Sequence, residues 1–462
     1  MKMNKINFMP HQTDVLKATE ECERCAYYLD MGLGKTFVGA EKLMRMKKSM
    51  NLLICQKSKI EDWIEHFKKY YSDFPYCISV FNLTNKKELQ QFMNAQKSLE
   101  PNFIYDEWTE QSYMQESLDP CQYIGVINYD LAFRRKQLLE LRDFTLMLDE
   151  SSIIQNDKTK RTKFILSLNS KNVILLSGTP TSGKYENLWS QCHMLGWNIS
   201  LRAFQTQYVN WQTIDVGGFP QKIVDKVNPY KNIERLKQKM RDHGAIFMKT
   251  EEVIDLPEQI YIDISLKKTK EYMKFMRKHL VQLTNEKNEL IELIGDTTLT
   301  KKLYARQLCG AYCKEKLAAF EDLVNSTQDR LIVFYNFNIE LEALKNICQK
   351  LERPISEVNG KIKSLSAYEN SSNSVTLVQY QAGAMGLNLQ KANKIIYFTL
   401  TERSELFEQS KKRIHRIGQK NTCFYYIMTC KRSVEEMIYE NLKKRKDYTD
   451  DLFKEYEETE DE

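Results

Sequence analysis

Two glycines, a lysine and a threonine gather near the N-terminus of the chain, in the segment Asp30-Met-Gly-Leu-Gly-Lys-Thr36. The apolar run Cys25–Leu29 before this segment predicts a strand, and the amphipathic pattern after it predicts a helix. Gly32 and Gly34 let backbone N–H groups turn toward a ligand, and the amino end of a helix favours an anion. The segment therefore predicts a loop that binds phosphate groups.

Lys35 and Thr36 would supply the chemistry of this loop. In a P-loop the lysine reaches the β- and γ-phosphates and the hydroxyl coordinates Mg²⁺, so ATP and Mg²⁺ are the predicted cofactors. Such a loop needs an acidic partner at the end of a neighbouring strand, and Asp149-Glu150 follows an apolar run. We expect Asp149 to hold the Mg²⁺ through water and Glu150 to orient or deprotonate the attacking water.

A basic segment in the last quarter of the chain, Gln409–Gln419, carries two arginines three residues apart, Arg413 and Arg416. This spacing predicts that they share one face of a helix, where both could reach the same phosphate. An arginine delivered to the γ-phosphate from a second domain accelerates hydrolysis by about 10³–10⁵. A solvated basic helix would explain the charges but not the Arg-Ile-Gly-Gln ending.

The first part of the chain alternates apolar runs with amphipathic segments, which is typical of a parallel sheet covered by helices. The predicted strands are Cys25–Leu29, Leu52–Cys55, Cys77–Phe81, Tyr123–Ile127, Thr145–Leu148 and Val173–Leu176. The predicted helices are Thr36–Met46, Lys59–Tyr71, Lys86–Gln96 and Leu131–Leu141. Residues 97–120 are expected to form an inserted surface loop.

The middle of the chain instead shows long helical patterns, and strand signals return near its end. The predicted helices there are Lys231–Arg241, Lys267–Ile294 and Thr300–Asn325, and the later strands are Leu331–Tyr335, Val375–Tyr380, Lys394–Phe398 and Cys423–Met428. We therefore predict an α/β fold with two parallel-sheet lobes of the P-loop NTPase type. The predicted divisions are lobe 1 at 1–180, helical insertions and an extended connector at 181–320, lobe 2 at 321–446 and an acidic tail at 447–462.

Charge and composition narrow the class of protein. The formal charge is +6, but eight acidic residues and one lysine between Asp450 and Glu462 leave +13 for the rest of the chain. A basic body favours a polyanionic partner. No run of about 18 apolar residues is present, so no membrane partner is expected. Eleven cysteines, an odd number scattered along the chain, argue against a disulfide scaffold and for the cytoplasm.

Five ordered motifs together resemble the SNF2 group of superfamily 2 helicase-like ATPases. These motifs are Asp30–Thr36, Leu148–Ser152, Ser177–Pro180, Gln381–Leu389 and Arg413–Gln419. Supporting similarities are Phe8–Gln12 to a glutamine motif, Cys55–Ser58 with Trp63 to motif Ia, Lys249–Pro257 to the inter-lobe connector, and Leu331–Phe337 to motif IV. The resemblance covers residues 8–445.

The resemblance implies two RecA-like lobes that bind ATP between them, with duplex DNA lying across both. Lobe 1 would supply Gln12, which reads adenine in relatives, together with Lys35, Thr36, Asp149 and Glu150. Lobe 2 would supply Gly386, Asn388, Arg413 and Arg416. The positions that correspond to nucleic-acid contacts are Lys57, Ser58, Thr179 and Asn336. One departure is that the family's Asp-Glu-Ala/Gly-His reads Asp149-Glu150-Ser151-Ser152, so that Ser152 stands at the histidine position. In relatives this position helps to link the ATP site to the rest of lobe 1.

The function that these signals favour is ATP-driven translocation along double-stranded DNA without sequence preference. The compact form and the Lys-, Asn- and Ile-rich composition favour a phage or prophage replication or recombination protein in the bacterial host cytoplasm, with other replication or recombination proteins as partners. Two alternatives stay open: a helicase that separates DNA or RNA strands, and a nucleotide-gated DNA-binding scaffold without significant turnover.

Overall fold

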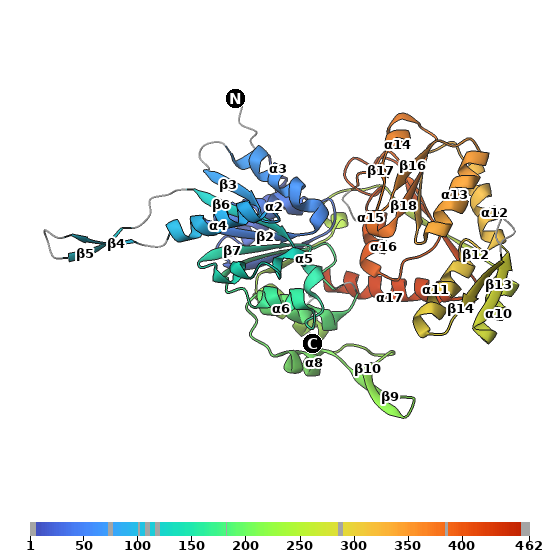
Figure 1. Cartoon of the computed structure of the whole chain (residues 1–462), viewed down its shortest axis with the longest axis horizontal. Helices are drawn as coiled ribbons and strands as arrows, with labels where there is room; N and C mark the ends of the chain where they lie inside the picture. The colour runs from blue at the N-terminus through green and yellow to red at the C-terminus, as the bar shows by residue number, and fades with distance from the viewer. Residues whose placement is uncertain are drawn as a thin grey trace, which may run out of the picture. The chain divides into compact units, whose positions relative to one another are not determined.

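The computed structural model describes residues 6–72, 77–99, 102–106, 111–115, 121–181, 183–284, 290–383 and 387–453. The chain forms two compact units, shown in Figure 1. Unit 1 comprises Met1–Val253 with Tyr448–Glu462, and unit 2 comprises Ile254–Asp447. The segment 181–320, for which helical insertions and a connector are predicted, is therefore divided between the two units.

Unit 1 is built on a seven-stranded sheet in which every pair of neighbours is parallel. Its order is β11 (Ala245–Met248), β1 (Arg24–Leu29), β8 (Asn172–Leu176), β7 (Phe144–Asp149), β2 (Met50–Cys55), β6 (Gln122–Asn128) and β3 (Ile78–Asn82). All six strands predicted for this part of the chain are confirmed. Because both faces of a parallel sheet are covered, its strands are continuous apolar runs, and β2 and β8 are buried along their whole length.

Helices cover the faces of this sheet and connect its strands along the chain. They are α1 (Pro10–Ala18), α2 (Lys35–Arg45), α3 (Ile60–Tyr71), α4 (Lys86–Ser98), α5 (Tyr129–Ala132), α6 (Lys160–Leu166), α7 (Trp189–Met194), α8 (Leu201–Tyr208) and α9 (Ile233–Asp242). Helix α2 packs so closely on the sheet that a Cβ at Gly39 would lie 2.7 Å from the Leu176 side chain. The first three predicted helices are confirmed. The fourth is wrong, because a short 3₁₀ helix over Lys136–Glu140 follows α5 in place of one continuous helix.

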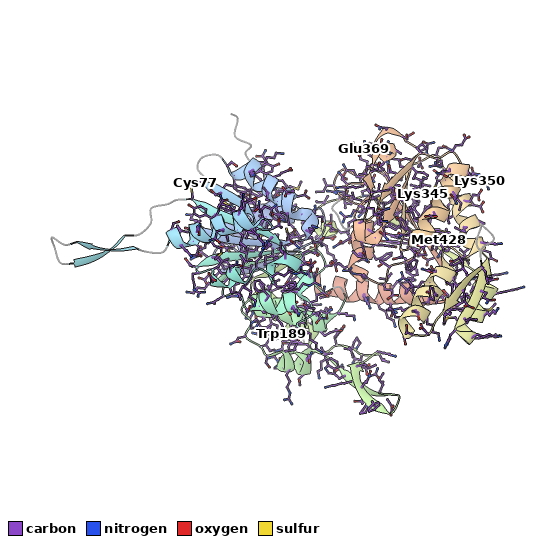
Figure 2. The ribbon with its side chains drawn as sticks, viewed as in Figure 1. Cys77, Trp189, Lys345, Lys350, Glu369 and Met428 are labelled. Carbon is purple, nitrogen blue, oxygen red and sulfur yellow. A yellow bond between two sulfur atoms is a disulfide. The ribbon has the colours of Figure 1, made fainter. Side chains whose placement is uncertain are left out.

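The inserted segment before β6 contains the hairpin β4 (Asn102–Asp106) and β5 (Gln111–Gln115), where a loop is predicted; the remainder of residues 100–120 lies outside the described residues. Cys77 and Cys121, which flank it, form a disulfide, and Figure 2 labels Cys77. The cysteine count did not predict this bond. It forms because β3 and β6 are neighbours in which Ile78 pairs with Gln122, so thiols 44 residues apart meet.

Unit 2 contains a second seven-stranded sheet, parallel except at its last strand. Its order is β12 (Gln259–Leu266), β20 (Cys423–Cys430), β19 (Lys394–Tyr397), β15 (Leu331–Tyr335), β18 (Val375–Gln379), β16 (Ile355–Val358) and β17 (Lys363–Ser364). Its helices are α10 (Lys270–Lys278), α11 (Thr298–Cys309), α12 (Lys314–Asn325), α13 (Asn338–Lys350), α14 (Ser366–Asn370), α15 (Tyr380–Gly383) and α16 (Ser404–Lys411), and α17 (Val434–Phe453) continues into unit 1. The four strands predicted here are confirmed, and so is the prediction of two parallel-sheet lobes.

The helical prediction for residues 181–320 is wrong in part. This segment supplies β11, β12 and two hairpins, β9 (Trp211–Val216) with β10 (Phe219–Val224), and β13 (Leu280–Thr284) with β14 (Leu290–Ile294). The predicted helix Lys267–Ile294 ends at His279, whose left-handed backbone (φ 57°) turns the chain into β13. The missed signal was alternation: Gln259–Leu266 places apolar residues at every second position, which predicts a strand.

Candidate functional site

The predicted lobe 1 motifs meet at one edge of the unit 1 sheet. All its strands are parallel, so the segments that follow β1, β7, β8 and β2 emerge at the same, carboxyl edge. The ends of three strands lie at nearly the same level, because Leu176 of β8 pairs with Tyr27 of β1 on one side and with Asp149 of β7 on the other. The phosphate loop, the Asp149-Glu150 pair and the Ser177–Pro180 segment are therefore brought together, as the sequence predicts.

Gly32 and Gly34 give the phosphate loop its shape. Both have positive φ values, 96° and 79°, which residues other than glycine rarely adopt. Helix α2 begins at Lys35, directly after Gly34. The Lys35 ammonium donates hydrogen bonds to the carbonyl oxygens of Leu29 (2.8 Å) and Asp30 (3.1 Å), and Thr36 is exposed on the first turn of the helix.

Gln12 contacts this loop from helix α1. It is buried, and its amide donates a 3.1 Å hydrogen bond to the Leu33 carbonyl. A Cβ at position 34 would lie 2.1 Å from Gln12 Nε2, so only glycine fits there without displacing the amide. The neighbouring ring of His11 also contacts the Leu33 carbonyl, at 3.1 Å. Helix α1 therefore fixes the position of the phosphate loop, and its glutamine lies beside it.

Asp149 is the last residue of β7, where the buried strand reaches the edge of the sheet. The Trp63 indole N–H donates a 2.8 Å hydrogen bond to Oδ2 of its carboxylate. Burial raises the pKa of Asp149, and the Trp63 hydrogen bond and the charge of Lys35 oppose that rise. Carboxylate and hydroxyl oxygens are the ligands that Mg²⁺ prefers, so Asp149 and Thr36 fit a magnesium site.

Glu150 connects the acidic pair to the Ser177–Pro180 segment. Its backbone is left-handed, with φ and ψ both 58°, which turns its side chain away from the strand direction. Its Oε1 accepts hydrogen bonds from Ser152 Oγ at 3.1 Å and from Ser177 Oγ at 3.0 Å. Ser152, which stands where the family has a histidine, thus bonds directly to Glu150, and Ser177 links Glu150 to the next motif.

Gln191 on helix α7 forms a second link that sequence reasoning missed. Its Oε1 accepts from Ser151 Oγ at 2.8 Å and from the Tyr28 hydroxyl at 3.0 Å, and its Nε2 donates to the Pro180 carbonyl at 2.7 Å. The side chain is fully buried. A lone glutamine in a helical pattern carries no signal of this role, because its three partners are distant in sequence.

The connector between the units is bonded at each end. The Thr250 hydroxyl donates a 3.0 Å hydrogen bond to Asp30 Oδ2 in the phosphate loop of unit 1. Further along, His415 Nε2 lies 2.8 Å from the Pro257 carbonyl within unit 2. Each end of the Lys249–Pro257 connector is therefore attached to a segment predicted to bind nucleotide.

The arginine segment of unit 2 does not lie on a helix face. Helix α16 ends at Lys411, so Arg413 and Arg416 lie in the turn that follows, and the prediction of a shared helix face is wrong. Arg413 is buried with its Nη1 3.5 Å from the Leu387 carbonyl, whereas Arg416 is half-buried and burial lowers its pKa.

The same turn packs on the segment that follows β18. Gln419 donates from Nε2 to the carbonyl oxygens of Gln390 (3.1 Å), Ala392 (2.9 Å) and Ile414 (3.2 Å). Asn388 is exposed on this segment, and its Oδ1 accepts a 3.4 Å hydrogen bond from the Gln390 N–H. Gly386, a predicted nucleotide contact, lies outside the described residues.

The predicted nucleic-acid residues differ in how available they are. Lys57 and Ser58 are exposed in a 3₁₀ turn at the carboxyl edge of the unit 1 sheet. Thr179 is buried, and its hydroxyl has no hydrogen-bond partner within the described part of the chain. The Asn336 amide donates to Thr399 Oγ1 at 2.9 Å and to the Leu400 carbonyl at 3.2 Å, so it is engaged inside unit 2.

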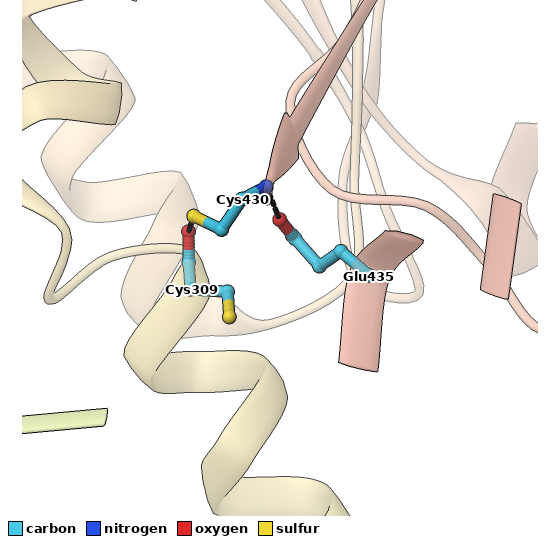
Figure 3. Close-up of side chains that lie close together, drawn as sticks. All are labelled: Cys309, Cys430 and Glu435. Atoms are coloured by element: carbon cyan, nitrogen blue, oxygen red, sulfur yellow. Dashed lines mark hydrogen bonds between the residues drawn. The ribbon is translucent and has the colours of Figure 1, made fainter. Parts of the chain in front are cut away.

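A buried group of thiols and a carboxylate lies elsewhere in unit 2. Among the described residues, Cys309, Cys430 and Glu435 form the only group of three or more whose metal-ligand atoms all lie within 4.8 Å of one another (Figure 3). Both carboxylate oxygens of Glu435 are already bound by the buried Lys316 ammonium, at 2.6 and 2.8 Å, and Oε2 also accepts from the Cys430 N–H at 3.1 Å. These contacts account for the group as a buried ion pair beside two thiols.

Two parallel sheets, one ending in a phosphate loop and an acidic pair and the other carrying an arginine turn, define a helicase-like protein with two RecA-like lobes. A family model of the SNF2-related domain matches residues 21–312, and a model of the helicase conserved C-terminal domain matches residues 315–418. The first match alone spans more than half of the chain. The chain belongs to the SNF2-related family.

Curated relatives are distant and longer. The SWI/SNF-related matrix-associated actin-dependent regulator of chromatin subfamily A member 1 of Mus musculus is 23% identical over 448 residues, which cover 89% of this chain and 40% of that protein. The DNA repair and recombination protein RAD26 of Saccharomyces cerevisiae is 23% identical over 471 residues, covering 89% and 43%. The chain thus spans about two fifths of the length of these relatives.

One solved structure similar to this chain is the Sulfolobus solfataricus SWI2/SNF2 ATPase core in complex with dsDNA, with 20% identity and a TM-score of 0.43 over 96% of this chain and 93% of that one. Within the part of the chain that the structure describes, no helix combines the length and the apolar character needed to cross a bilayer.

Proposed function

We propose that this protein hydrolyses ATP and uses the energy to move along double-stranded DNA. The observation that carries the proposal is the arrangement at the carboxyl edge of the unit 1 sheet. There the phosphate loop follows β1, and Asp149 is the last residue of β7, with β8 between these two strands. Glu150 accepts a hydrogen bond from Ser177 of the next motif. A lysine, a metal-binding carboxylate and a base in one place are the parts that phosphoryl transfer to water requires.

Each residue of unit 1 has a distinct task in this proposal. Lys35 leaves the carbonyl oxygens that it now contacts and binds the β- and γ-phosphates, while Gln12 binds the adenine. Thr36 and, through water, Asp149 would hold Mg²⁺, which would supply positive charge beside the phosphates. Glu150 takes the proton of the attacking water, and its bonds to Ser152 and Ser177 hold the carboxylate in place for that step.

Unit 2 completes the site in this proposal. Arg416 stabilises charge on the γ-phosphate, and the buried Arg413 supports the turn that presents it. Asn388 is a further proposed nucleotide contact of this unit, and so is Gly386, which lies outside the described residues. Binding of ATP to both units favours one arrangement of them and hydrolysis releases it, which converts the chemistry into movement.

Duplex DNA is the proposed track. The charge of +13 outside the tail suits a polyanion, and relatives are named for chromatin regulation and for DNA repair and recombination. The exposed Lys57 and Ser58 are the proposed contacts, made to the phosphate backbone and therefore without sequence preference, whereas the buried Thr179 and the engaged Asn336 would have to change their surroundings to reach DNA. The finer setting that we propose is replication or recombination of phage or prophage DNA, with proteins of those processes as partners, in the host cytoplasm.

Two experiments test the function. ATPase activity is measured with and without duplex DNA, and displacement of a triplex-forming strand reports movement along intact duplex. We expect DNA-stimulated hydrolysis and triplex displacement by the wild type, and neither by Glu150→Gln, which still binds ATP. A rate near zero that DNA does not change would favour the scaffold. Unwinding of forked DNA or RNA without triplex displacement would favour the strand-separating helicase.

A further inference from the structure

Trp63 is buried in helix α3 and contacts the proposed magnesium site. It is 2% exposed, and its ring packs on Phe67 at 5.8 Å and on His66 at 6.0 Å between centroids. These contacts fix the direction of its indole N–H, which donates the 2.8 Å hydrogen bond to Asp149 Oδ2. An indole can only donate, and an ionised carboxylate can only accept, so this bond has a single sense.

A carboxylate at the end of a strand can rotate about its χ angles unless something holds it. The backbone around Asp149 is held by the Tyr129 hydroxyl, which donates to the Asp149 carbonyl at 2.9 Å, but that bond does not fix the side chain. Two described groups donate hydrogen bonds to the carboxylate, the Trp63 indole N–H and the backbone N–H of Glu150, and of these the Trp63 bond is the one made by a side chain. Such outer partners of a metal ligand typically change metal affinity by about 10–100-fold when removed.

We propose that Trp63 is a positioning residue for Asp149, the carboxylate proposed to hold Mg²⁺ through water, a role that rests on the proposed ATPase function. Its indole N–H holds one carboxylate oxygen, so the carboxylate would keep a fixed orientation toward the site where Mg²⁺ would be held. The substitution Trp63→Phe removes the N–H and keeps most of the ring. It therefore separates the hydrogen bond from the packing.

The protein offers a matched control in Trp189 of helix α7, labelled in Figure 2. Its indole N–H also donates a 2.8 Å hydrogen bond, but to the backbone carbonyl of Ile199. Trp189→Phe thus removes an equivalent bond in the same unit without changing a proposed metal ligand.

The test measures binding of radiolabelled ATP by equilibrium dialysis as Mg²⁺ is titrated, and again in EDTA. For Trp63→Phe we expect the Mg²⁺ concentration at half-effect to rise about tenfold, with ATP affinity in EDTA unchanged. Trp189→Phe should match the wild type in both. In an Asp149→Asn background, Trp63→Phe should cause no further change. An unchanged Mg²⁺ requirement in folded Trp63→Phe would overturn the proposal.

A second measurement does not depend on the folding of Trp63→Phe. The protein has five tryptophans, so labelling with 5-fluorotryptophan gives five ¹⁹F signals. The signal that Asp149→Asn shifts most is expected to move when Mg²⁺ is added to the ATP-bound wild type, and a signal that stays fixed contradicts the proposed role. Absence of any Mg²⁺-dependent ATP binding by the wild type would instead reject the ATPase function itself.

Discussion

The absence of a side chain at Gly34 allows the phosphate loop to pack against helix α1. The positive φ of this residue is one reason for glycine, and the 2.1 Å that would separate a Cβ from Gln12 Nε2 is another. The positive φ constrains the backbone of the loop, whereas the short Cβ distance involves Gln12, the residue that we propose to bind adenine. A substitution here therefore tests both the loop and the role of Gln12.

Gly34→Ala is expected to lower ATP affinity at least tenfold, because the left-handed backbone is strained by about 1–2 kcal/mol and Gln12 is displaced. If Gln12 reads adenine, the preference for ATP over GTP should fall as well. Competition binding with the two nucleotides measures both effects. In a Gln12→Ala background the preference should not fall further, and a Gly34→Ala protein that keeps the wild-type preference would contradict the adenine role.

Glu340 is a buried residue of unit 2 whose two carboxyl oxygens differ in their hydrogen bonding. Its Oε2 accepts from the backbone N–H groups of Asn336 (2.9 Å) and Phe337 (3.1 Å) and from Thr399 Oγ1 (2.9 Å), whereas Oε1 has no hydrogen-bond partner within the described residues. Burial raises the pKa of Glu340 to about 7, because the hydrogen bonds offset only part of the loss of solvation. Below about pH 7 the protonated form of Glu340 is therefore favoured in the folded protein.

This pKa predicts that stability falls as pH rises. The pKa in the unfolded chain is about 4.3, so between that pH and about 7 the folded state binds one more proton than the unfolded state. The free energy of unfolding should fall by up to about 1.4 kcal/mol per pH unit in this window. Thermal unfolding of wild type and Glu340→Gln at pH 5 and pH 7.5 measures it.

The variant Glu340→Gln cannot ionise, so its melting temperature should change less with pH than that of the wild type. Glu342→Gln, at an exposed position of the same helix, should keep the wild-type dependence. Equal pH dependence in all three proteins would show that Glu340 does not titrate in this window.

Helix α7 links three parts of unit 1 through Gln191. Its bonds to Tyr28, Ser151 and Pro180 join the strand before the phosphate loop, the residue after Glu150 and the last residue of the Ser177–Pro180 segment. With the Glu150–Ser177 bond, they give this chain two hydrogen-bonded routes between its motifs. Helix α7 thus connects the segments around the phosphate loop and the acidic pair through buried hydrogen bonds.

Gln191→Leu is expected to destabilise unit 1 by about 2–4 kcal/mol, because it leaves three buried polar groups without their partner. Tyr28→Phe removes one of the three bonds and should cost about 1 kcal/mol. Chemical unfolding followed by circular dichroism compares them. Similar small losses in both variants would show that water or other side chains satisfy the partners.

The elements that sequence predicted well are those with continuous apolar character. Strands such as Leu331–Tyr335 are fully buried, and burial on both faces leaves a signal that needs no tertiary information. The helix predicted at Lys267–Ile294 failed because a single left-handed residue, His279, separates α10 from a hairpin. The motifs placed the phosphate loop and acidic pair at one edge, but Gln191 and the Trp63 bond depend on contacts between distant segments.

At the scale of the whole molecule, the basic body implies that the proposed binding to DNA is largely electrostatic. Lys57 is exposed at the carboxyl edge of the unit 1 sheet and is a proposed phosphate contact. Lys57→Ala should weaken binding to all duplex sequences alike and reduce the slope of log K against log salt by about 1. Fluorescence anisotropy over a salt series measures this slope.

Lys17→Ala, an exposed lysine on helix α1, should leave the slope unchanged if it lies away from the DNA. A loss that depends on the DNA sequence would contradict a backbone contact for Lys57, because phosphates are the same at every position.

The division of the chain between Val253 and Ile254 has a consequence for dissecting the protein. Strand β11 stays with the sheet of unit 1, and β12, which begins at Gln259, stays with the sheet of unit 2. Cleavage of the chain at this junction would divide neither seven-stranded sheet, and residues 448–462, which belong to unit 1, would remain on the second polypeptide. Co-production of such halves offers a way to ask whether covalent continuity is needed once both have folded.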